Sequence, residues 1–359
     1  MTIILNNIRF ELKEFSTKSV LLNENYPLNR PISKLLRMWI LGVKKFEIYT
    51  SGSTGVATKI ILKREWLETS ALQTINLLNL WNEIVLCCLP TNKIGGLMMI
   101  IRSIVADFDI QIIEPKSDPM VDISSDHPFT FVSLVPSQLK TILESTESTK
   151  KLNRFKNILL GGSDINIEIL NRIQTLKPNI YHTYGMTETC SHIALKKLNN
   201  DAWPHFKPNP FVELKTNNEG WLSIKAYQTG DEWVNTKDIV KLYSDGCFDF
   251  IGRADFLINT GGFKVFPEQL EIKIGDIFNA HKMEIEFAIC SKLSDKWGEE
   301  IVLVIKSNLY TDNEIFKVLK LILLNYELPK KIFRLESIPV NKGGKKDRIK
   351  LREIIRSIC

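Results

Sequence analysis

The sequence contains no run of about 18 apolar residues, the length that a membrane-spanning helix requires. Its first residues, MTIILNNIRFELKEF, mix charged and apolar side chains and show no basic segment followed by a long apolar one, so we expect no signal peptide. The six cysteines form no C-x-x-C pair, which argues against a zinc ribbon and a disulfide framework. These absences favour a cytoplasmic protein without a membrane span.

The chain carries an excess of positive charge, which by itself does not identify a binding partner. The net charge is +6, and part of it lies in the segment from Lys342 to Arg352. A basic tail is usually a solvated surface, and otherwise a site for an anionic ligand. No aromatic residues alternate with these basic residues, so we expect no nucleic-acid partner.

Between Phe46 and about Ile193, short apolar segments alternate with amphipathic stretches. The segments that predict strands are FEIYT, TKIILK, EIVLCCL, IQIIE, FTFVSLV, KNILLG and NIYHTY. Helical periodicity marks REWLETSALQTINLLNLW, GGLMMIIRSIVADF, PSQLKTILES and NIEILNRIQTL. This alternation predicts an α/β fold with a mostly parallel sheet covered by helices, and ligands beyond the carboxyl ends of the strands.

The pattern changes after Trp203. A Pro-rich loop and short strands separated by turn residues predict a small β region that extends to about Phe250. From Gly252 the chain has its own succession of elements, with a helix opening at Pro267 and another over EIFKVLKLILLNY. We therefore expect a large domain of residues 1–253 and a smaller α+β domain of residues 254–359.

Four polar or glycine-rich stretches stand out: YTSGSTG (49–55), YHTYGMTETC (181–190), DGCFDFIGRADFLINTGGFKVFPEQLE (245–271) and PVNKGGKKDR (339–348). The glycines of the first allow backbone N–H groups to surround an anion. It is neither a Walker loop nor a nucleophile elbow, because both consensus patterns are missing. Taken alone, it fits a flexible loop equally well. In the second, a carboxylate suits a hard cation such as Mg²⁺, and a polar loop with a helix cap is the alternative.

In this order, the four stretches resemble the motifs of the adenylate-forming superfamily, which contains acyl-CoA synthetases, luciferases and peptide-synthetase adenylation domains. The resemblance extends from about Tyr49 to the end of the chain. Within the superfamily, the chain is most similar to the short o-succinylbenzoate–CoA ligases of menaquinone biosynthesis. The similar segments are YGMTETCSHIALKKLN (184–199), LPTNKIGGLMMIIRSIV (89–105) and INTGGFKVFPEQLE (258–271).

The resemblance implies a reaction in two steps. A small-molecule carboxylic acid attacks ATP to give an acyl-adenylate and pyrophosphate, and the thiol of coenzyme A then displaces AMP. The implied cofactors are ATP, Mg²⁺ and coenzyme A, the last as a co-substrate. Another acyl- or aryl-CoA ligase, an adenylation enzyme that loads a carrier-protein thiol, and a nucleotide-binding module without turnover remain as alternatives.

The resemblance also implies which residues bind the nucleotide and the metal. The residues that would hold the β- and γ-phosphates are Thr50, Ser51, Gly52, Ser53, Thr54 and Gly55. Those that would surround the adenine are Gly161, Gly162, Ser163 and Tyr184. Glu188 would bind Mg²⁺, and Thr187 would donate to the α-phosphate. Asp238 would accept bonds from the ribose hydroxyls, and Arg253 would assist there or at a phosphate.

The remaining implied roles concern catalysis and the acid. Lys345 would meet the negative charge of the adenylation transition state. Asp255 would be the hinge about which the C-terminal domain moves between the two steps, and Gly261, Gly262 and Lys264 would form the loop used in the thioester step. The predicted acyl pocket contains Lys93, Gly95, Ser191 and His192.

Three positions depart from the superfamily pattern. The lysine expected after the phosphate loop comes one position late, as Lys59. Lys93 stands where a histidine is frequent. The usual T-G-D sequence appears as Thr236-Lys237-Asp238: lysine replaces the glycine, and the aspartate is kept.

Overall fold

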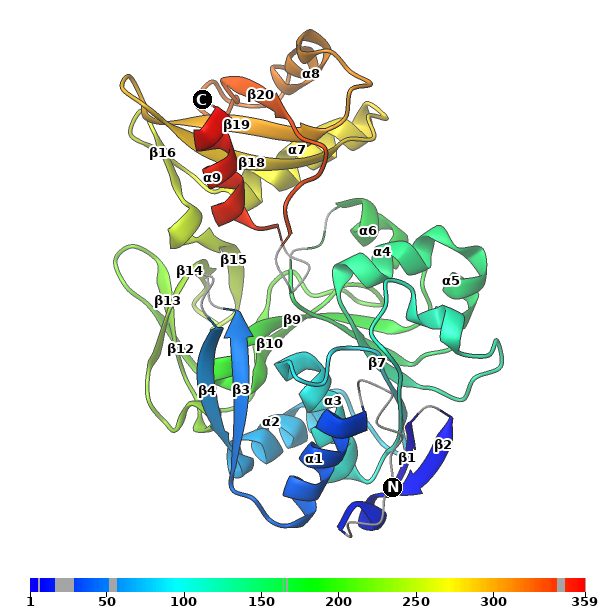
Figure 1. Cartoon of the computed structure of the whole chain (residues 1–359). Coiled ribbons are helices and arrows are strands. Elements are labelled where there is room, and N and C mark those ends of the chain that lie inside the picture. The colour runs from blue at the N-terminus through cyan, green and yellow to red at the C-terminus, as the bar shows by residue number, and fades with distance from the viewer. Residues whose placement is uncertain are drawn as a thin grey trace.

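The computed structural model describes residues 1–5, 7–16, 29–51, 57–163, 165, 167–340 and 346–358. Within these ranges the chain forms one large part and, at the opposite end of the molecule from the N-terminus, a smaller part that contains the last helix (Figure 1). In the described segments, no helix has the length and apolar character needed to cross a membrane.

The large part is built on a nine-stranded sheet with the order β11-β10-β9-β8-β7-β5-β6-β1-β2. Its strands are β1 (Thr2–Leu5), β2 (Ile8–Glu11), β5 (Ile84–Cys87), β6 (Asp109–Ile112), β7 (Phe131–Leu134), β8 (Asn157–Leu160), β9 (Asn179–Met186), β10 (Ser191–Lys197) and β11 (Lys207–Pro208). All pairings from β9 to β1 are parallel, and those at both edges are antiparallel. The predicted α/β class is therefore confirmed.

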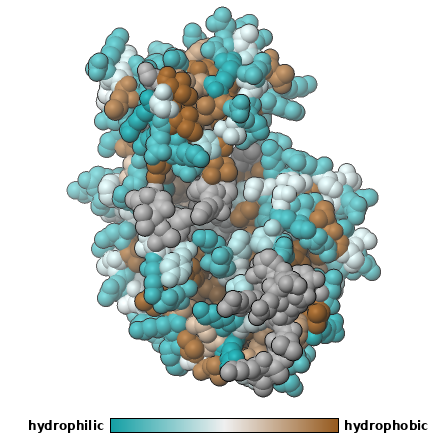
Figure 2. All heavy atoms as spheres, in the orientation of Figure 1, coloured by the Kyte–Doolittle hydropathy of each residue, from teal (hydrophilic) through white to brown (hydrophobic). Residues whose placement is uncertain are grey.

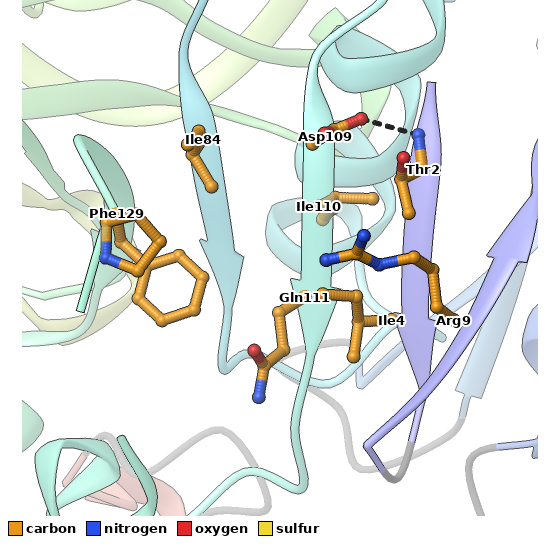
Figure 3. A pocket seen from close by; sticks show the side chains of 9 residues that line it. Thr2, Ile4, Arg9, Ile84, Asp109, Ile110, Gln111 and Phe129 are labelled. Carbon is orange, nitrogen blue, oxygen red and sulfur yellow. Dashed lines mark hydrogen bonds between the residues drawn. The ribbon is translucent and has the colours of Figure 1, made fainter. Parts of the chain in front are cut away.

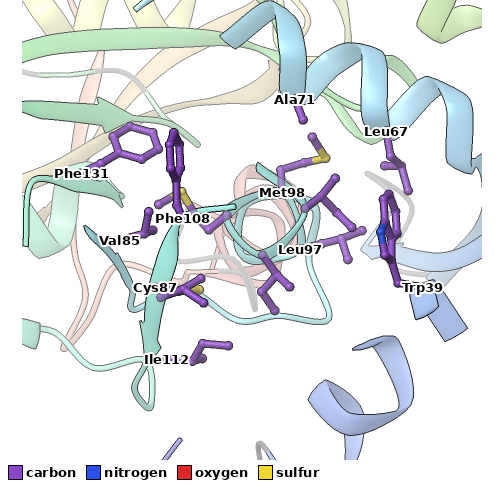
Figure 4. Packing of buried hydrophobic residues seen from close by; sticks show 14 of the residues in the cluster. Trp39, Leu67, Ala71, Val85, Cys87, Leu97, Met98, Phe108, Ile112 and Phe131 are labelled. Carbon is purple, nitrogen blue, oxygen red and sulfur yellow. The ribbon is translucent and has the colours of Figure 1, made fainter. Parts of the chain in front are cut away.

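Helices cover both faces of this sheet. They are α1 (Asn29–Ile40), α2 (Arg64–Leu77), α3 (Ile94–Ala106), α4 (Pro136–Glu144), α5 (Thr146–Leu152) and α6 (Ile167–Ile173). Alternate residues of β5 point to opposite faces: Val85 and Cys87 pack with α3, whereas Leu86 lies in the core beneath α4 and α6. Figure 4 shows Val85 and Cys87 on the side of Leu97 and Met98. Burial on both faces explains why these strands are continuously apolar.

Two predicted strands do not join the parallel sheet. Strands β3 (Lys45–Ser51) and β4 (Ala57–Lys63) pair with each other as an antiparallel hairpin that forms a sheet of its own. Parallel pairing requires a crossover of a dozen or more residues, and the segment between these strands is too short for one. The two strand segments are confirmed, and their pairing as a separate hairpin was not predicted.

A four-stranded antiparallel sheet follows, as the turn-rich pattern predicts. It contains β12 (Glu213–Thr216), β13 (Trp221–Lys225), β14 (Val234–Leu242) and β15 (Phe248–Arg253). Phe206, Phe248 and Leu222 bury this sheet against Ile193 and Ala194 of β10. The packing brings the β14–β15 pair beside β9, whose carboxyl end lies in the large sheet.

The smaller part is an α+β unit with its own sheet. Its elements are β16 (Ile258–Thr260), β17 (Phe263–Val265), α7 (Pro267–Ala280), β18 (Glu286–Ser294), β19 (Gly298–Lys306), α8 (Asp312–Leu319), β20 (Lys331–Arg334) and α9 (Arg348–Ile358). α7 and α8 share a core on one face of the sheet, and α9 packs on the other. Hydrophilic side chains cover most of the face shown in Figure 2, with apolar ones between them.

The helix predicted over EIFKVLKLILLNY is shorter than expected, because α8 ends at Leu319. Of the following apolar residues, Leu321, Ile322 and Leu324 are exposed and only Leu323 returns to the core. The carboxylate of Glu327 accepts the backbone N–H of Leu324, which satisfies a donor outside the helix. A side-chain acceptor of this kind competes with continued helix.

Candidate active site

Predicted nucleotide residues meet at the carboxyl ends of β8 and β9. Gly161 follows β8 and donates its N–H to Leu134 O at 3.1 Å. A Cβ at position 161 would lie 2.7 Å from Thr183 Oγ1, and Gly162 has a φ of +106°, so both positions favour glycine. The carbonyl of Ser163 contacts His182 Nε2 at 3.2 Å. The two glycines have no side chains and the segment lies against β9, so a flat ring could pack on its backbone.

The end of β9 places Thr187 and Glu188. A Cβ on Gly185 would lie 2.1 Å from Ser191 O, so only glycine allows β9 and β10 to approach so closely there. The strand then turns through a short 3₁₀ helix, η3 (Thr187–Thr189), in which Thr187 is buried and Glu188 is exposed. No cluster of three metal-ligating side chains occurs among the described residues. A single exposed carboxylate nevertheless fits Mg²⁺, which is commonly held by one carboxylate together with substrate phosphates.

The predicted ribose residues Asp238 and Arg253 form one hydrogen-bonded group with Tyr184, which was predicted to lie at the adenine. Asp238 Oδ2 accepts from the hydroxyl of Tyr184 at 2.7 Å, and Asp238 Oδ1 accepts from Arg253 Nη1 at 2.7 Å. Burial and the neighbouring Asp238 raise the pKa of Tyr184 well above its ordinary value, so its hydroxyl remains a donor. Each carboxylate oxygen has a second lone pair, so Asp238 retains acceptors for two ribose hydroxyls.

A cavity of about 510 Å³ lies near these residues; none of the predicted site residues lines it, but its wall residue His182 contacts the carbonyl of Ser163. Its walls come from β9, β10, β14, β15 and α7, and its lining residues include Ile165, His182, Lys196, Phe206, Lys241, Phe250 and Gln269. Burial lowers the pKa of His182 to about 4, so the imidazole is neutral at pH 7. The lining combines apolar side chains with Lys196, Lys241 and Asp249, and we do not assign this cavity to the nucleotide.

A second cavity, of about 290 Å³, lies at the other side of the large sheet. Figure 3 shows Thr2, Arg9, Asp109 and Gln111 around it, with Asp109 Oδ1 accepting from Thr2 N at 2.5 Å. None of the predicted site residues lines it. We assign it no part in the chemistry.

The predicted hinge residue is held by two cations. Asp255 lies in the 3₁₀ helix η5 (Ala254–Phe256), and its oxygens contact Lys237 Nζ at 2.6 Å and Arg253 Nη2 at 3.1 Å. Partial burial alone would raise the pKa of Asp255, but the bonds from Lys237 and Arg253 outweigh burial and hold the pKa below its ordinary value. Arg253 thus bridges the ribose carboxylate and the hinge carboxylate.

The predicted thioester-step loop is a tight turn between β16 and β17. Gly261 and Gly262 have φ values of +59° and +84°, and Gly261 donates its N–H to Trp297 O at 2.8 Å. Lys264 is exposed. Lys345 lies outside the described residues, but its flanking residues Lys346 and Arg348 both contact Glu271 of α7 at 2.8 Å.

The predicted acyl pocket contains a buried polar group. His192 Nε2 lies 3.1 Å from Thr74 Oγ1, whose own hydrogen goes to Ser70 O at 3.0 Å, so Nε2 carries the proton. Burial, and secondarily the charge of Arg102, lower the pKa of His192 well below its ordinary value. Arg102 Nη2 donates to Ser191 Oγ at 3.3 Å.

Arg102 is the residue that the sequence-based assignment missed. Its side chain lies on α3 and is only 2% exposed, and its Nε has no partner among the described residues. Desolvation lowers its pKa to about 9, and no described carboxylate forms an ion pair with it to oppose this. The signal was a lone charged residue inside the apolar helical segment IGGLMMIIRSIVA.

Other predicted positions are only partly placed. Lys93 precedes α3 and donates to Tyr49 O at 3.1 Å, and Gly95 lies in the first turn of α3. Lys59 pairs across the hairpin with Glu47 at 2.5 Å, an ion pair that it would have to leave in order to reach a phosphate. Strand β3 extends through Thr50 and Ser51, and the other predicted phosphate-loop residues, 52–55, lie outside the described residues. The phosphate-binding role of this hairpin stays a prediction.

The comparisons with known proteins agree with the ordered motifs. Residues 46–243, more than half of the chain, match the family described as "AMP-binding enzyme". A 2-succinylbenzoate–CoA ligase from Staphylococcus epidermidis is 27% identical over 297 residues, which cover 76% of this chain and 61% of that protein. The chain therefore spans about three fifths of the length of this relative.

Solved structures match over more of the chain. An AMP-forming acyl-CoA synthetase/AMP-acid ligase II-like protein from Dyadobacter fermentans shares 32% identity, with coverage of 89% of this chain and 91% of that one and a TM-score of 0.59. An o-succinylbenzoate CoA synthetase from Bacillus subtilis, solved with its acyl-adenylate intermediate, shares 22% identity over 85% of this chain and 68% of that one, with a TM-score of 0.72. The second likeness shows the fold alone. The resemblance inferred from the motifs is confirmed.

Proposed function

Because the chain belongs to the family of AMP-binding enzymes, we propose that it is an acid–CoA ligase that forms an acyl-adenylate and then a thioester. A carboxylate is a poor acyl donor, and joining it to AMP supplies a leaving group. Nucleotidyl transfer needs in-line positioning and cations against the developing negative charge more than it needs covalent help. The residues around the carboxyl ends of β8 and β9 have the chemical types for these tasks.

In this proposal, each described group has one task. The glycine turn after β8 takes the adenine, and Asp238 accepts the ribose hydroxyls while Tyr184 and Arg253 fix its orientation. Glu188 would hold a magnesium ion, which supplies positive charge to the phosphate oxygens. Thr187 directly precedes Glu188 in η3 and would donate to the same phosphates.

The observation that carries the substrate class is the isolated cation in the acyl region. A buried guanidinium without a carboxylate costs free energy in the free protein, and an anionic ligand group would repay that cost. Arg102 contacts Ser191, three residues beyond Glu188. We therefore propose an acid with a second anionic group, and o-succinylbenzoate, an aromatic diacid, is the one that we favour. A guanidinium can hold that second carboxylate through two parallel hydrogen bonds.

The substrate class is tested by measuring pyrophosphate release with a set of acids, ATP and Mg²⁺. We expect o-succinylbenzoate to support release, and matched aromatic acids without the second carboxylate to require far higher concentrations. Equal release with the monoacids would contradict the proposal for Arg102. If no acid in a broad panel releases pyrophosphate although ATP binds, the chain is a nucleotide-binding module without turnover.

We further propose that the thiol belongs to coenzyme A. On the smaller part, the rings of Phe263 and Tyr326 stack at 4.4 Å with planes 6° apart, and Phe263, directly after the glycine turn, is 53% exposed. Lys330 lies 5.7 Å from the ring of neighbouring Trp297. An exposed aromatic face beside a lysine suits a nucleotide with phosphates, which coenzyme A carries and the thiol arm of a carrier protein lacks.

Replacing Tyr326 by alanine tests this assignment. Tyr326 supports the ring of Phe263, on whose exposed face the base would stack. Stacking of a base is worth about 1–3 kcal/mol, so losing this support should raise the KM for coenzyme A by about fivefold. Adenylate formation, measured without coenzyme A, should remain normal. Tyr326→Phe, which keeps the stack, is the matched control. An unchanged KM in the alanine variant, or an equal loss in the variant with phenylalanine, would contradict the assignment.

The domain boundary at residues 253 and 254 is also a proposal. It is supported by the separate sheet of the smaller part and by the short helix η5 at the junction. If Asp255 is the hinge, Asp255→Pro should leave adenylate formation intact and slow thioester formation, because proline restricts the backbone change. Normal rates for both steps would show that the hinge lies elsewhere.

A further inference from the structure

The junction between the two parts carries a contact that the superfamily pattern does not require. Where that pattern usually has glycine, this chain has Lys237, directly before the ribose residue Asp238. The Lys237 side chain is 56% exposed, and its ammonium lies 2.6 Å from Asp255 Oδ1. A glycine at position 237 has no side chain with which to make this contact.

The hinge aspartate is held from more than one side. Arg253 Nη2 contacts the other oxygen of Asp255 at 3.1 Å. From the smaller part, Arg352 of α9 donates to the backbone carbonyls of Asp255 and Phe256, each at 3.3 Å. Of the three cations that contact residues 255 and 256, Lys237 lies on β14. It has no other ion-pair partner among the described residues.

The orientation held by this contact places α7 of the smaller part against β15 of the large part. α7 lines the 510 Å³ cavity through Gln269 and contacts β15 there, with Gln269 Nε2 donating to Phe250 O at 3.4 Å. Glu271 of the same helix holds Lys346 and Arg348, and α9 begins at its end nearer the large part (Figure 1). Phe263, in contrast, remains exposed. This orientation, in which α7 rather than Phe263 lies against the large part, is the one that we assign to adenylate formation.

We propose that Lys237 is a positioning residue whose ammonium holds the hinge carboxylate of Asp255 and must release it before the smaller part reorients for the thioester step. The inference rests on the proposed function, because it assigns the two orientations to the two half-reactions. Lys237 thereby adjusts the balance between them without touching either substrate. Its contribution is that of an exposed ion pair, so it biases the equilibrium rather than locking it.

The first test needs no catalytic activity. Hydrogen–deuterium exchange of residues 254–257 in the full chain without ligands should become about two- to fivefold faster in Lys237→Ala, the range expected for losing an exposed ion pair. Lys225→Ala, which breaks the 3.0 Å contact with Glu213 between β12 and β13, is the matched control and should leave this exchange unchanged. Unchanged exchange in Lys237→Ala would overturn the proposal, whether or not the chain is a ligase.

The second test separates positioning from a general structural effect. With the two half-reactions measured separately, Lys237→Ala should raise the ratio of the thioester rate to the adenylate rate by about two- to fivefold. Asp255→Asn removes this contact together with that from Arg253, so it should raise the ratio at least as much. The double variant should show no gain beyond Asp255→Asn, because the Lys237 contact is already lost there. An unchanged ratio, or additive effects, would overturn the positioning role. If neither half-reaction occurs with any acid, the proposed function fails while the exchange result still decides the contact.

Discussion

Replacing Lys345 by alanine should slow acyl-adenylate formation by about 10²–10³-fold, the size usual for losing one preorganised electrostatic contact. The expected cause is the loss of a cation between the attacking carboxylate and the α-phosphate, where negative charge concentrates in the transition state. Its neighbours favour such a placement, because the contacts of Glu271 with Lys346 and Arg348 hold the residues directly after position 345 on α7. The measurement is single-turnover formation of the adenylate without coenzyme A.

The same variant should convert supplied acyl-adenylate into thioester almost normally, since the lysine is not expected to act in that step. Lys350→Ala is the matched control, because Lys350 is an exposed lysine of the same basic tail on α9. A comparable loss in both half-reactions of Lys345→Ala would mean that the residue supports folding or another step. A comparable loss in Lys350→Ala would mean that the overall charge of the tail, rather than one position, matters.

Replacing Arg102 by methionine should raise the KM for the diacid by about 30-fold or more, because removing one partner of a buried charge pair costs about 2 kcal/mol or more. Methionine keeps most of the length of the side chain and removes its charge. The free protein should not lose stability, since the guanidinium has no carboxylate partner among the described residues and its burial is a cost. The rate of adenylate formation as a function of diacid concentration, and unfolding by urea, would be measured on the same samples.

Two comparisons make this prediction specific. Arg102→Lys keeps the positive charge but not the planar fork, so it should retain part of the affinity for the diacid. A monoacid should show little difference between the wild-type protein and Arg102→Met. If the variant loses affinity for diacids and monoacids alike, or unfolds at clearly lower urea, Arg102 supports the structure and does not select the substrate.

The parts of the fold that follow from local pattern were predictable. The alternating apolar segments gave the α/β class, and the ordered motifs identified the family because each combines residue types that one chemistry needs. The position of the β3–β4 hairpin was not predicted, because apolar alternation reports a strand and not its partner. The end of α8 also depends on Leu323 and Glu327, whose contacts arise only in the folded smaller part.

The site residues that escaped prediction act through contacts distant in the sequence. Arg102 meets Ser191 from a position 89 residues earlier, and its isolation is visible only when its surroundings are known. Lys237 was recognised as a departure from the superfamily pattern, but its partner Asp255 is 18 residues away across the β14–β15 pair. A sequence motif shows which residues are present. The roles of Arg102 and Lys237 depend on which residues they contact in the folded chain.

The central claim is that this chain activates a diacid as its adenylate. Mass spectrometry of the full chain mixed with o-succinylbenzoate, ATP and Mg²⁺, but no coenzyme A, tests it directly. We expect an enzyme-bound o-succinylbenzoyl-adenylate in an amount equal to the pyrophosphate released, which disappears on addition of coenzyme A as the thioester and AMP form. Bound ATP that stays intact with this acid and with a panel of other acids would contradict the claim.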